Sequence, residues 1–265
     1  MKVRVAAAQP MTFQKEREPE NLPVALEYIR QAGEEGAKFI CFPEGYPGPY
    51  SGSMDFDPTG ELADAAKKHG IYVLAGGLEE AGPDAFYNLL DFYTPDGKMA
   101  YRYKRCQSAG DGVDLPLFGR HVREGDELKV LETPHGNVGL QVCSEIFSPE
   151  MSRVLALDGA DIIFYPAGGM FYEVSESWRI LVRARAIETG CFVVAPAQGG
   201  KHEDGRETFG HSLIVSPWGE VIAEADGAEP GIVLAELDLD EVAKARGRIP
   251  SLRNDRDVRM ARLGS

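Results

Sequence analysis

The strongest constraint on the fold is a series of short apolar segments in which several neighbouring residues are all apolar. A strand with one face in water alternates apolar and polar side chains, so an unbroken apolar segment indicates burial on both faces. Each sheet must therefore be covered on both sides. We expect strands at 3–9, 39–44, 72–78, 89–94, 138–143, 161–168, 191–198 and 211–216.

Helical segments alternate with these strands. Residues 21–33, 58–69 and 176–189 carry apolar side chains at the three- and four-residue spacing of a helix with one buried face. A further helix is predicted from Pro149, with Ser148 as its N-cap and Gly159 as its stop. This alternation is typical of β-helix-β units.

A four-residue turn recurs three times, as "TPDG" at 94–97, "TPHG" at 133–136 and "SPWG" at 216–219. Proline at the second position and glycine at the fourth are typical of type I turns, so each predicts a β-hairpin. Hairpins combined with β-helix-β units predict two mixed sheets covered by helices, an α/β fold. No linker divides the chain, so we expect one domain over residues 1–265.

The charge balance limits the partners. The chain has 42 acidic and 28 basic residues, a formal net charge of −14, which would repel phosphate backbones and anionic lipids. No segment approaches the roughly 18 apolar residues of a membrane helix, and the N-terminal apolar segment is too short for a signal peptide. We therefore expect a cytoplasmic protein with a small-molecule substrate, and neither nucleic acid nor membrane as partner.

One of the four cysteines stands out. No pair is spaced as Cys-x-x-Cys, so neither a zinc ribbon nor a redox dithiol is indicated, and Cys41 and Cys191 lie within apolar strands as core residues. Cys143 instead ends the segment "VGLQVC" just before a predicted helix. This position is the carboxyl edge of a strand, where α/β sheets place ligands beside backbone N–H groups. A thiol with such donors suits covalent acyl chemistry.

A nucleophilic thiol needs a nearby base or cation. Glu44 ends the apolar strand "FICFPE" and Lys104 ends the hairpin strand "MAYRYK", so a carboxylate and an amine lie at two further strand ends. Solvated surface positions are the alternative for both. Histidine is the other usual base, and a Cys/His pair stays open with His69, His121, His135, His202 or His211.

The chain resembles the nitrilase or carbon–nitrogen hydrolase superfamily along nearly its whole length. "FPEGYPGPY" is similar to the glutamate motif of that superfamily, "YRYKRC" to its lysine motif and "GLQVCSEIFSPE" to its cysteine motif, in the same order. The later stretches "WRILVRARAIETGCFVVAPAQGG", "FGHSLIVSPWGEVIAE" and "RGRIPSLRNDR" resemble the amidase-type branches.

The resemblance implies a four-layer α-β-β-α sandwich that pairs into homodimers or higher homo-oligomers. It implies a catalytic triad of Glu44, Lys104 and Cys143. In this scheme Glu44 takes the thiol proton and Cys143 attacks the carbon of a non-peptide carbon–nitrogen bond, while Lys104 and the backbone N–H of Ser144 stabilise the oxyanion. Ammonia or an amine leaves, and water hydrolyses the thioester without metal or organic cofactor.

The same matching implies a substrate site for a small aliphatic amide or N-carbamoyl amine. The residues matched to it are Tyr50, Ser144, Phe147, Ala167, Gly168 and Gly169. Many relatives have an aromatic residue where Ser144 stands, and true nitrilases usually read Cys-Trp-Glu, so nitrile hydrolysis is disfavoured. Relatives acting on dicarboxylate monoamides often have arginine at position 147, so Phe147 favours a substrate without that carboxylate.

One family feature is replaced. Many relatives carry a second glutamate seven residues before the glycine matched by Gly125, and Phe118 stands there. Asp111 or Asp114 is an alternative carboxylate. A nitrilase, an acyltransferase that resolves the thioester with an amine, and a non-catalytic scaffold of the same fold remain alternatives to the amidase.

Overall fold

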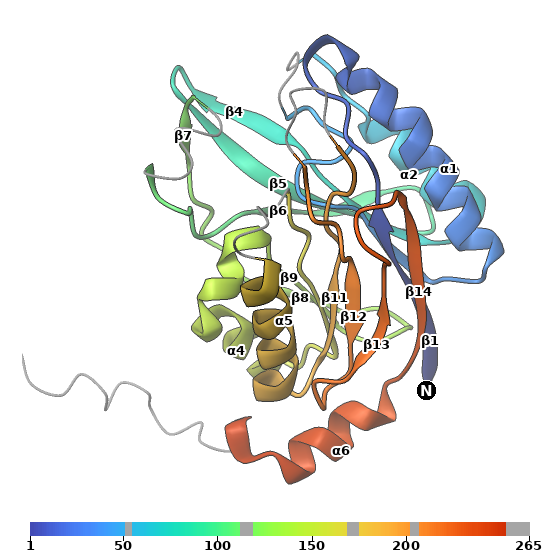
Figure 1. The fold of residues 1–265 in the computed structure, drawn as a ribbon, viewed down its shortest axis with the longest axis vertical. Helices are drawn as coiled ribbons and strands as arrows, with labels where there is room; N and C mark the ends of the chain where they lie inside the picture. The colour runs from blue at the N-terminus through green and yellow to red at the C-terminus, as the bar shows by residue number, and fades with distance from the viewer. Residues whose placement is uncertain (51–54, 112–118, 169–174, 202–206, 253–265) are drawn as a thin grey trace, which may run out of the picture.

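Two mixed β-sheets pack face to face, with helices on both outer sides (Figure 1). The computed structural model describes residues 1–50, 55–111, 119–168, 175–201 and 207–252. Four layers in the order α-β-β-α result. The predicted α/β sandwich of two mixed sheets is confirmed.

The first sheet contains the N-terminal half of the chain and the last strand. Its order is β14-β1-β2-β3-β5-β4, and β6 and β7 also pair with β5. Strands β1, β2 and β3 are parallel to one another, whereas β14, β4 and β6 pair antiparallel with their neighbours. The strands are β1 (Lys2–Gln9), β2 (Phe39–Cys41), β3 (Tyr72–Ala75), β4 (Leu78–Gly82), β5 (Ala85–Tyr93), β6 (Met99–Lys104), β7 (His121–Val122) and β14 (Gly231–Asp238).

The second sheet has the order β13-β12-β11-β10-β9-β8. Its centre is parallel, because β10 pairs in parallel with both β9 and β11, and its two edges are hairpins. The strands are β8 (Val130–Leu131), β9 (Val138–Leu140), β10 (Ile162–Phe164), β11 (Phe192–Ala195), β12 (Leu213–Val215) and β13 (Val221–Glu224).

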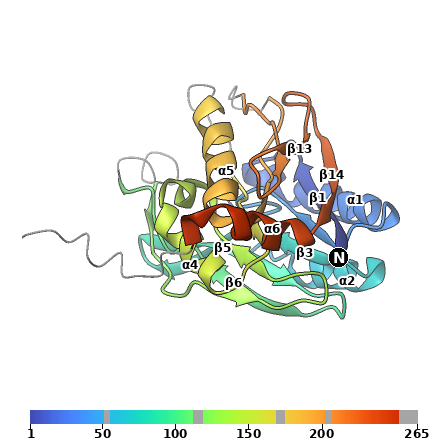
Figure 2. The same ribbon diagram turned by 90° about the horizontal axis from the view of Figure 1, so that it is seen from below.

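Each sheet has its own pair of covering helices. Helices α1 (Asn21–Glu34) and α2 (Thr59–His69) cover the first sheet, and α4 (Pro149–Leu157) and α5 (Ser175–Thr189) cover the second. Helix α6 (Asp240–Arg248) follows β14 and runs across the lower end of the molecule (Figure 2). Short 3₁₀ helices span Lys15–Glu20, Cys143–Phe147 and Pro250–Leu252. Among the described helices, none has the length and apolarity needed to cross a bilayer.

Three apolar layers hold the sandwich together. Side chains of both sheets meet in the middle layer, where Phe39 of β2 contacts Phe164 of β10 at a ring-centroid distance of 5.9 Å. Residues at alternate positions of the same strands face the outer layers, where Ile40 packs under α1 and α2 and Ile163 under α4 and α5. Burial on both faces explains why the strands are continuously apolar.

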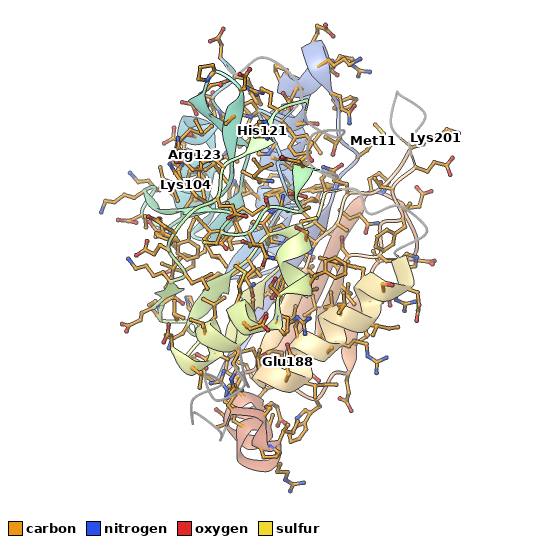
Figure 3. The ribbon with its side chains drawn as sticks, turned by 90° about the vertical axis from the view of Figure 1, so that its left-hand side faces the viewer. Met11, Lys104, His121, Arg123, Glu188 and Lys201 are labelled. Carbon is orange, nitrogen blue, oxygen red and sulfur yellow. The ribbon has the colours of Figure 1, made fainter. Side chains whose placement is uncertain are left out.

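The three predicted turns lie in hairpins. "TPDG" joins β5 to β6, "TPHG" joins β8 to β9 and "SPWG" joins β12 to β13. In each, the glycine N–H donates to the carbonyl oxygen of the first turn residue, at 2.9, 3.3 and 2.9 Å respectively. Strands β6 and β7, which both pair with β5, lie at the side of the molecule where Lys104, His121 and Arg123 reach the surface (Figure 3).

Two local expectations need correction. Strand β9 ends at Leu140 rather than at Cys143, because the chain turns there into a 3₁₀ helix. Ser148 occupies the N-cap position of α4 without a side-chain capping bond, since its hydroxyl donates to Gln107 Oε1 instead. The helix does begin at Pro149, and Gly159 follows its end with a φ of 96°.

Gly125 supports the chain segment that follows β6. A Cβ atom at this position would lie 2.3 Å from the carbonyl oxygen of Lys104, and the Gly125 N–H donates to the Arg105 carbonyl at 2.9 Å. We expect Gly125→Ala to lower the free energy of unfolding by about 1–3 kcal/mol, because the backbone contact cannot relax by rotation of a side chain.

Gly60→Ala is the matched control, because a Cβ atom there meets no atom within 4 Å inside α2. This variant should be neutral or stabilised by up to about 1 kcal/mol. Urea unfolding followed by circular dichroism measures both values. Equal stability of the two variants would contradict the close-contact explanation.

Candidate functional site

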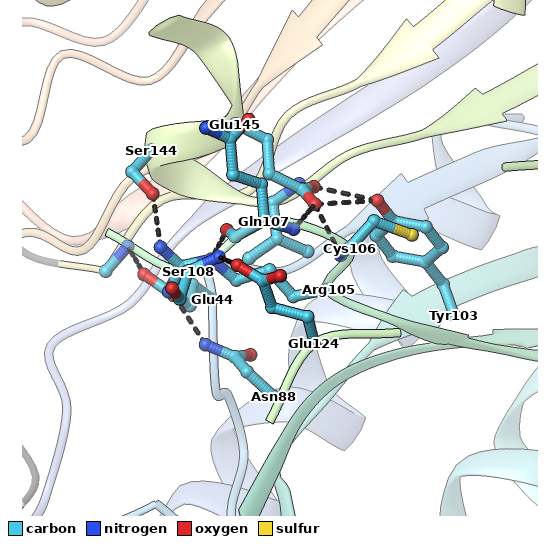
Figure 4. Close-up of polar contacts among 12 residues, drawn as sticks. Glu44, Asn88, Tyr103, Arg105, Cys106, Gln107, Ser108, Glu124, Ser144 and Glu145 are labelled. Carbon is cyan, nitrogen blue, oxygen red and sulfur yellow. Dashed lines mark hydrogen bonds and ion pairs between the residues drawn. The ribbon is translucent and has the colours of Figure 1, made fainter. Parts of the chain in front are cut away.

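The centre of the site is the carboxylate of Glu44, which is 5% exposed. It lies three residues beyond β2 of the first sheet. Asn88 Nδ2 on β5 donates to Glu44 Oε1 at 2.6 Å, and the backbone N–H of Gly168, beyond β10 of the second sheet, donates to Oε2 at 2.9 Å (Figure 4). Donors from both sheets therefore hold this carboxylate in one orientation.

Cys143 lies where the chain leaves the second sheet. Its φ of 49° is in the left-handed region, which is uncommon for a residue other than glycine and marks a sharp turn. The backbone N–H of Cys143 donates to the Pro166 carbonyl at 2.8 Å, so the turn is tied to the segment that leads to Gly168. Backbone conformations of this kind cluster at functional sites.

The surroundings of the Cys143 thiol disfavour its charged form. Burial raises its pKa above the usual range, and the carboxylate of Glu44 and its hydrogen bond to the thiol raise it further. The guanidinium of Arg105 and the N–H of Gly168 act in the opposite direction. A thiol in this environment needs a base to become a nucleophile, and Glu44 lies beside it.

A second buried carboxylate, that of Glu145, joins the cysteine turn to the end of β6. Glu145 accepts hydrogen bonds from the backbone N–H groups of Val142, Cys106 and Gln107 at 2.6, 2.6 and 3.0 Å. The hydroxyl of Tyr103 adds a fourth donor at 2.8 Å. Burial raises the pKa of Glu145 to about 7 even though these donors lower it. The prediction from sequence did not include this residue.

Arg105 places a buried guanidinium beside Glu44. It is 2% exposed, and its Nη1 lies 3.7 Å from Glu44 Oε1. Its Nη2 donates to the hydroxyl of Ser144, and its Nε donates to the Gln107 carbonyl at 2.9 Å. The guanidinium therefore lies between the Glu44 carboxylate and the residue that follows Cys143 (Figure 4).

The structure does not bring Lys104 to this site, and this corrects the predicted arrangement. Lys104 Nζ lies 3.0 Å from Glu79 Oε1 and 3.7 Å from the ring centroid of Tyr87, on the surface of the molecule (Figure 3). Successive side chains of a strand point to opposite faces. Because Tyr103 faces the core, Lys104 must face outward and Arg105 inward.

The predicted substrate-binding residues do not all lie at Glu44. Tyr50 and Gly168 adjoin Glu44: a Cβ atom on Gly168 would lie 2.8 Å from Glu44 Oε2 and 3.6 Å from the Tyr50 hydroxyl oxygen. Ser144 contacts Arg105, and Ala167 is buried one residue before Gly168. Phe147 is 55% exposed, and Gly169 lies outside the described residues.

The alternative acid and base residues have other contacts. Asp111 Oδ1 lies 2.9 Å from His121 Nδ1 at the surface, and His211 Nδ1 lies 2.9 Å from Glu224 Oε1. Asp114, Phe118 and His202 lie outside the described residues. Within the described ranges, no group of three or more His, Cys, Asp and Glu side chains could hold a metal ion.

A separate cavity of about 290 Å³ lies on the outer side of the first sheet. Asp91, Arg102 and the start of α2 line it, and neither Glu44 nor Cys143 does. Arg102 pairs with Asp91 at 2.8 Å and with Glu79 at 2.7 Å, so these charges are already matched within the protein.

The chain is similar to known proteins over almost its whole length. The chain is 32% identical over 274 residues to a deaminated glutathione amidase of Synechocystis, with 96% of this chain and 98% of the relative covered. It is 31% identical to an omega-amidase of Xenopus tropicalis, with 89% and 90% covered. The C. elegans NitFhit protein superposes with a TM-score of 0.85 at 27% identity, over 96% of this chain and 65% of that longer one. The profile of the carbon-nitrogen hydrolase family matches residues 4–247, and the chain therefore belongs to the carbon-nitrogen hydrolase family.

Proposed function

We propose that this hydrolase cleaves the amide bond of a small molecule through a thioester on Cys143. The observation that carries the proposal is the placement of the Cys143 thiol within the electrostatic reach of a fixed carboxylate, Glu44, whose donors come from both sheets. A neutral thiol and an adjacent base are the two parts that covalent acyl transfer requires.

The reaction follows from these positions. Glu44 accepts the thiol proton while Sγ of Cys143 attacks the amide carbonyl carbon, and the carbonyl electron pair moves to the oxygen. The tetrahedral intermediate collapses, its carbon–nitrogen bond breaks, and Glu44 returns the proton to the leaving ammonia or amine. Glu44 then takes a proton from water as the water oxygen attacks the thioester carbon. The carbon–sulfur bond breaks, the carboxylic acid leaves, and Glu44 returns the proton to the thiolate of Cys143.

The oxyanion of each tetrahedral intermediate needs donors. The backbone N–H of Ser144 follows the nucleophile directly, which is the usual position for such a donor. Residue 168 is a glycine, and a Cβ atom there would lie 2.8 Å from Glu44 Oε2. The absence of a side chain at this position leaves room for a substrate beside the Glu44 carboxylate.

The amide class is favoured over N-carbamoyl amines and nitriles. Two relatives more than 30% identical over almost the whole chain are named for amidase activity, a deaminated glutathione amidase and an omega-amidase. Ser144 in place of an aromatic residue separates this chain from the usual nitrilase pattern. A non-catalytic scaffold is disfavoured because its thiol would not need a fixed carboxylate beside it.

The first test is ammonia release by the wild type and by Cys143→Ala across short aliphatic amides, amides that carry a carboxylate, N-carbamoyl amino compounds and nitriles. We expect release from an amide to fall more than about a thousandfold in the variant, because the covalent route is lost. Cys106→Ala, which changes another partly buried thiol, should retain most of the activity.

The outcomes on this panel separate the alternatives. Release from a nitrile alone would contradict the amide assignment. A thioester that is detected by intact mass spectrometry but is not hydrolysed to the free acid would indicate an acyltransferase. Silence on all four classes from a folded protein would favour the scaffold.

The raised pKa of Cys143 gives a pH prediction. Only the thiolate reacts with iodoacetamide, and below the thiol pKa its fraction grows about tenfold per pH unit. Alkylation of Cys143 should therefore rise from pH 6 to pH 9 without reaching a plateau, as followed by peptide mass spectrometry. A plateau near neutral pH would show a preformed thiolate and contradict the need for a base.

We also propose that the protein forms a homodimer through the helices of the second sheet. Phe147 and four residues of α4 and α5 are exposed large apolar side chains, whereas α1 and α2 expose none. The four are Val154, Leu157, Ile180 and Ile187. Both helix pairs are outer layers of one sandwich, so this difference favours a second copy as the cover of α4 and α5.

Leu157→Glu combined with Ile180→Glu tests the dimer by light scattering after size exclusion. The wild type should elute at twice the chain mass of 28.9 kDa and the double variant at 28.9 kDa. Met99→Glu is the control, since Met99 is 37% exposed on β6 of the other sheet. A wild-type monomer, or a double variant that remains dimeric, would overturn the proposed interface.

A reducing compartment suits this chemistry. All four cysteines are free, and a nucleophilic thiol is lost on oxidation. We therefore propose a cytoplasmic location.

A further inference from the structure

The end of β6 determines which cation faces the reaction. Lys104 pairs with Leu89 in the β5–β6 register, and the next N–H, that of Arg105, donates to the Asn88 carbonyl at 2.9 Å. Asn88 and Arg105 are therefore neighbours on the inner face of the first sheet, and both reach Glu44 Oε1. Lys104 lies on the opposite face.

The contacts of Arg105 orient its guanidinium. Nη1 is directed to Glu44, Nη2 to the Ser144 hydroxyl and Nε to the Gln107 carbonyl. Three different partners at three different nitrogens leave the planar group little freedom to turn. The guanidinium is thereby held between Glu44 and Ser144, the residue that follows Cys143.

We propose that Arg105, and not Lys104, is the catalytic cation that stabilises the oxyanion of the amide hydrolysis. The inference rests on the proposed function and names a residue for it. The guanidinium carries a permanent positive charge between Glu44 and Ser144, so it can stabilise a charged oxygen beside Cys143 without leaving either partner. Arg105 also lowers the pKa of Cys143, the sense expected of a cation that favours the thiolate.

Arginine has a chemical consequence here. A guanidinium does not lose its proton in proteins, so Arg105 cannot supply the proton that the leaving amine takes. Both proton transfers then fall to Glu44. The buried ion pair with Arg105 keeps that carboxylate close to a positive charge at each stage.

Four variants test the assignment: Arg105→Met, Arg105→Lys, Lys104→Met and the exchange Lys104→Arg with Arg105→Lys. We expect Arg105→Met to lower kcat by about 10²–10³-fold with little change in KM, because the lost interaction belongs to the transition state. Lys104→Met should stay within about threefold of the wild type, since its amine contacts only Glu79 and Tyr87 among the described interactions.

The exchange variant keeps the composition and places a primary amine at position 105. It and Arg105→Lys should both be more active than Arg105→Met, because a cation is retained on the inner face. If Arg105→Met does not fold, as judged by circular dichroism, the comparison of Arg105→Lys with Lys104→Met still decides between the two positions. A loss of more than about a hundredfold in Lys104→Met with near-normal rates in the Arg105 variants would overturn the assignment.

Alkylation of Cys143 by iodoacetamide provides a readout that needs no substrate. At a fixed pH of 8, removal of the charge at position 105 should slow alkylation several-fold, whereas Lys104→Met should leave the rate unchanged. If the wild type cleaves no amide, the proposed function fails, but this comparison still tests Arg105. Equal alkylation rates in wild type and Arg105→Met would contradict the electrostatic coupling.

Discussion

The face-to-face packing of the two sheets is the constraint on which the site depends. Glu44 leaves the first sheet and Cys143 leaves the second, and they meet only because the apolar side chains between the sheets fix the distance across the sandwich. Close packing at the density of protein interiors allows little sliding between layers. The hydrogen bond from Gly168 to Glu44 then sets the final alignment with a polar contact across the same interface.

A second buried carboxyl group, that of Glu145, connects the segment around Cys143 to the segment that follows β6. Glu145 shares no bond with Glu44, but it accepts donors from the cysteine turn and from the segment after β6. These two segments carry Cys143 and Arg105. The relative position of Cys143 and Arg105 is therefore set by one side chain that itself takes no part in the proposed chemistry, and this buried carboxyl group is tolerated because its donors satisfy it.

Much of this arrangement could be predicted from the sequence. Continuous apolar strands, helical spacing and repeated Pro/Gly turns indicated two covered mixed sheets, and the positions of Glu44 and Cys143 after strands indicated a shared edge. The structure places Lys104 on the outer face, against Glu79 and Tyr87, because a strand end offers adjacent residues on opposite faces and the motif letters do not say which face is inside. The burial of Tyr103 resolves it: strict alternation from an aromatic core residue points to Arg105. Asn88 and Glu145 carry no comparable signal, since their partners are backbone groups and distant side chains that only the folded chain brings near.

The division of the site between sheets also bears on how the protein loses activity. Glu44 and Asn88 belong to one sheet, and Cys143 and Gly168 to the other. Any partly folded state in which the two sheets loosen while each keeps its helices would retain most secondary structure and yet separate Glu44 from Cys143. Loss of activity should therefore report the separation of the two sheets earlier than the circular dichroism signal of the helices, by which unfolding is usually followed.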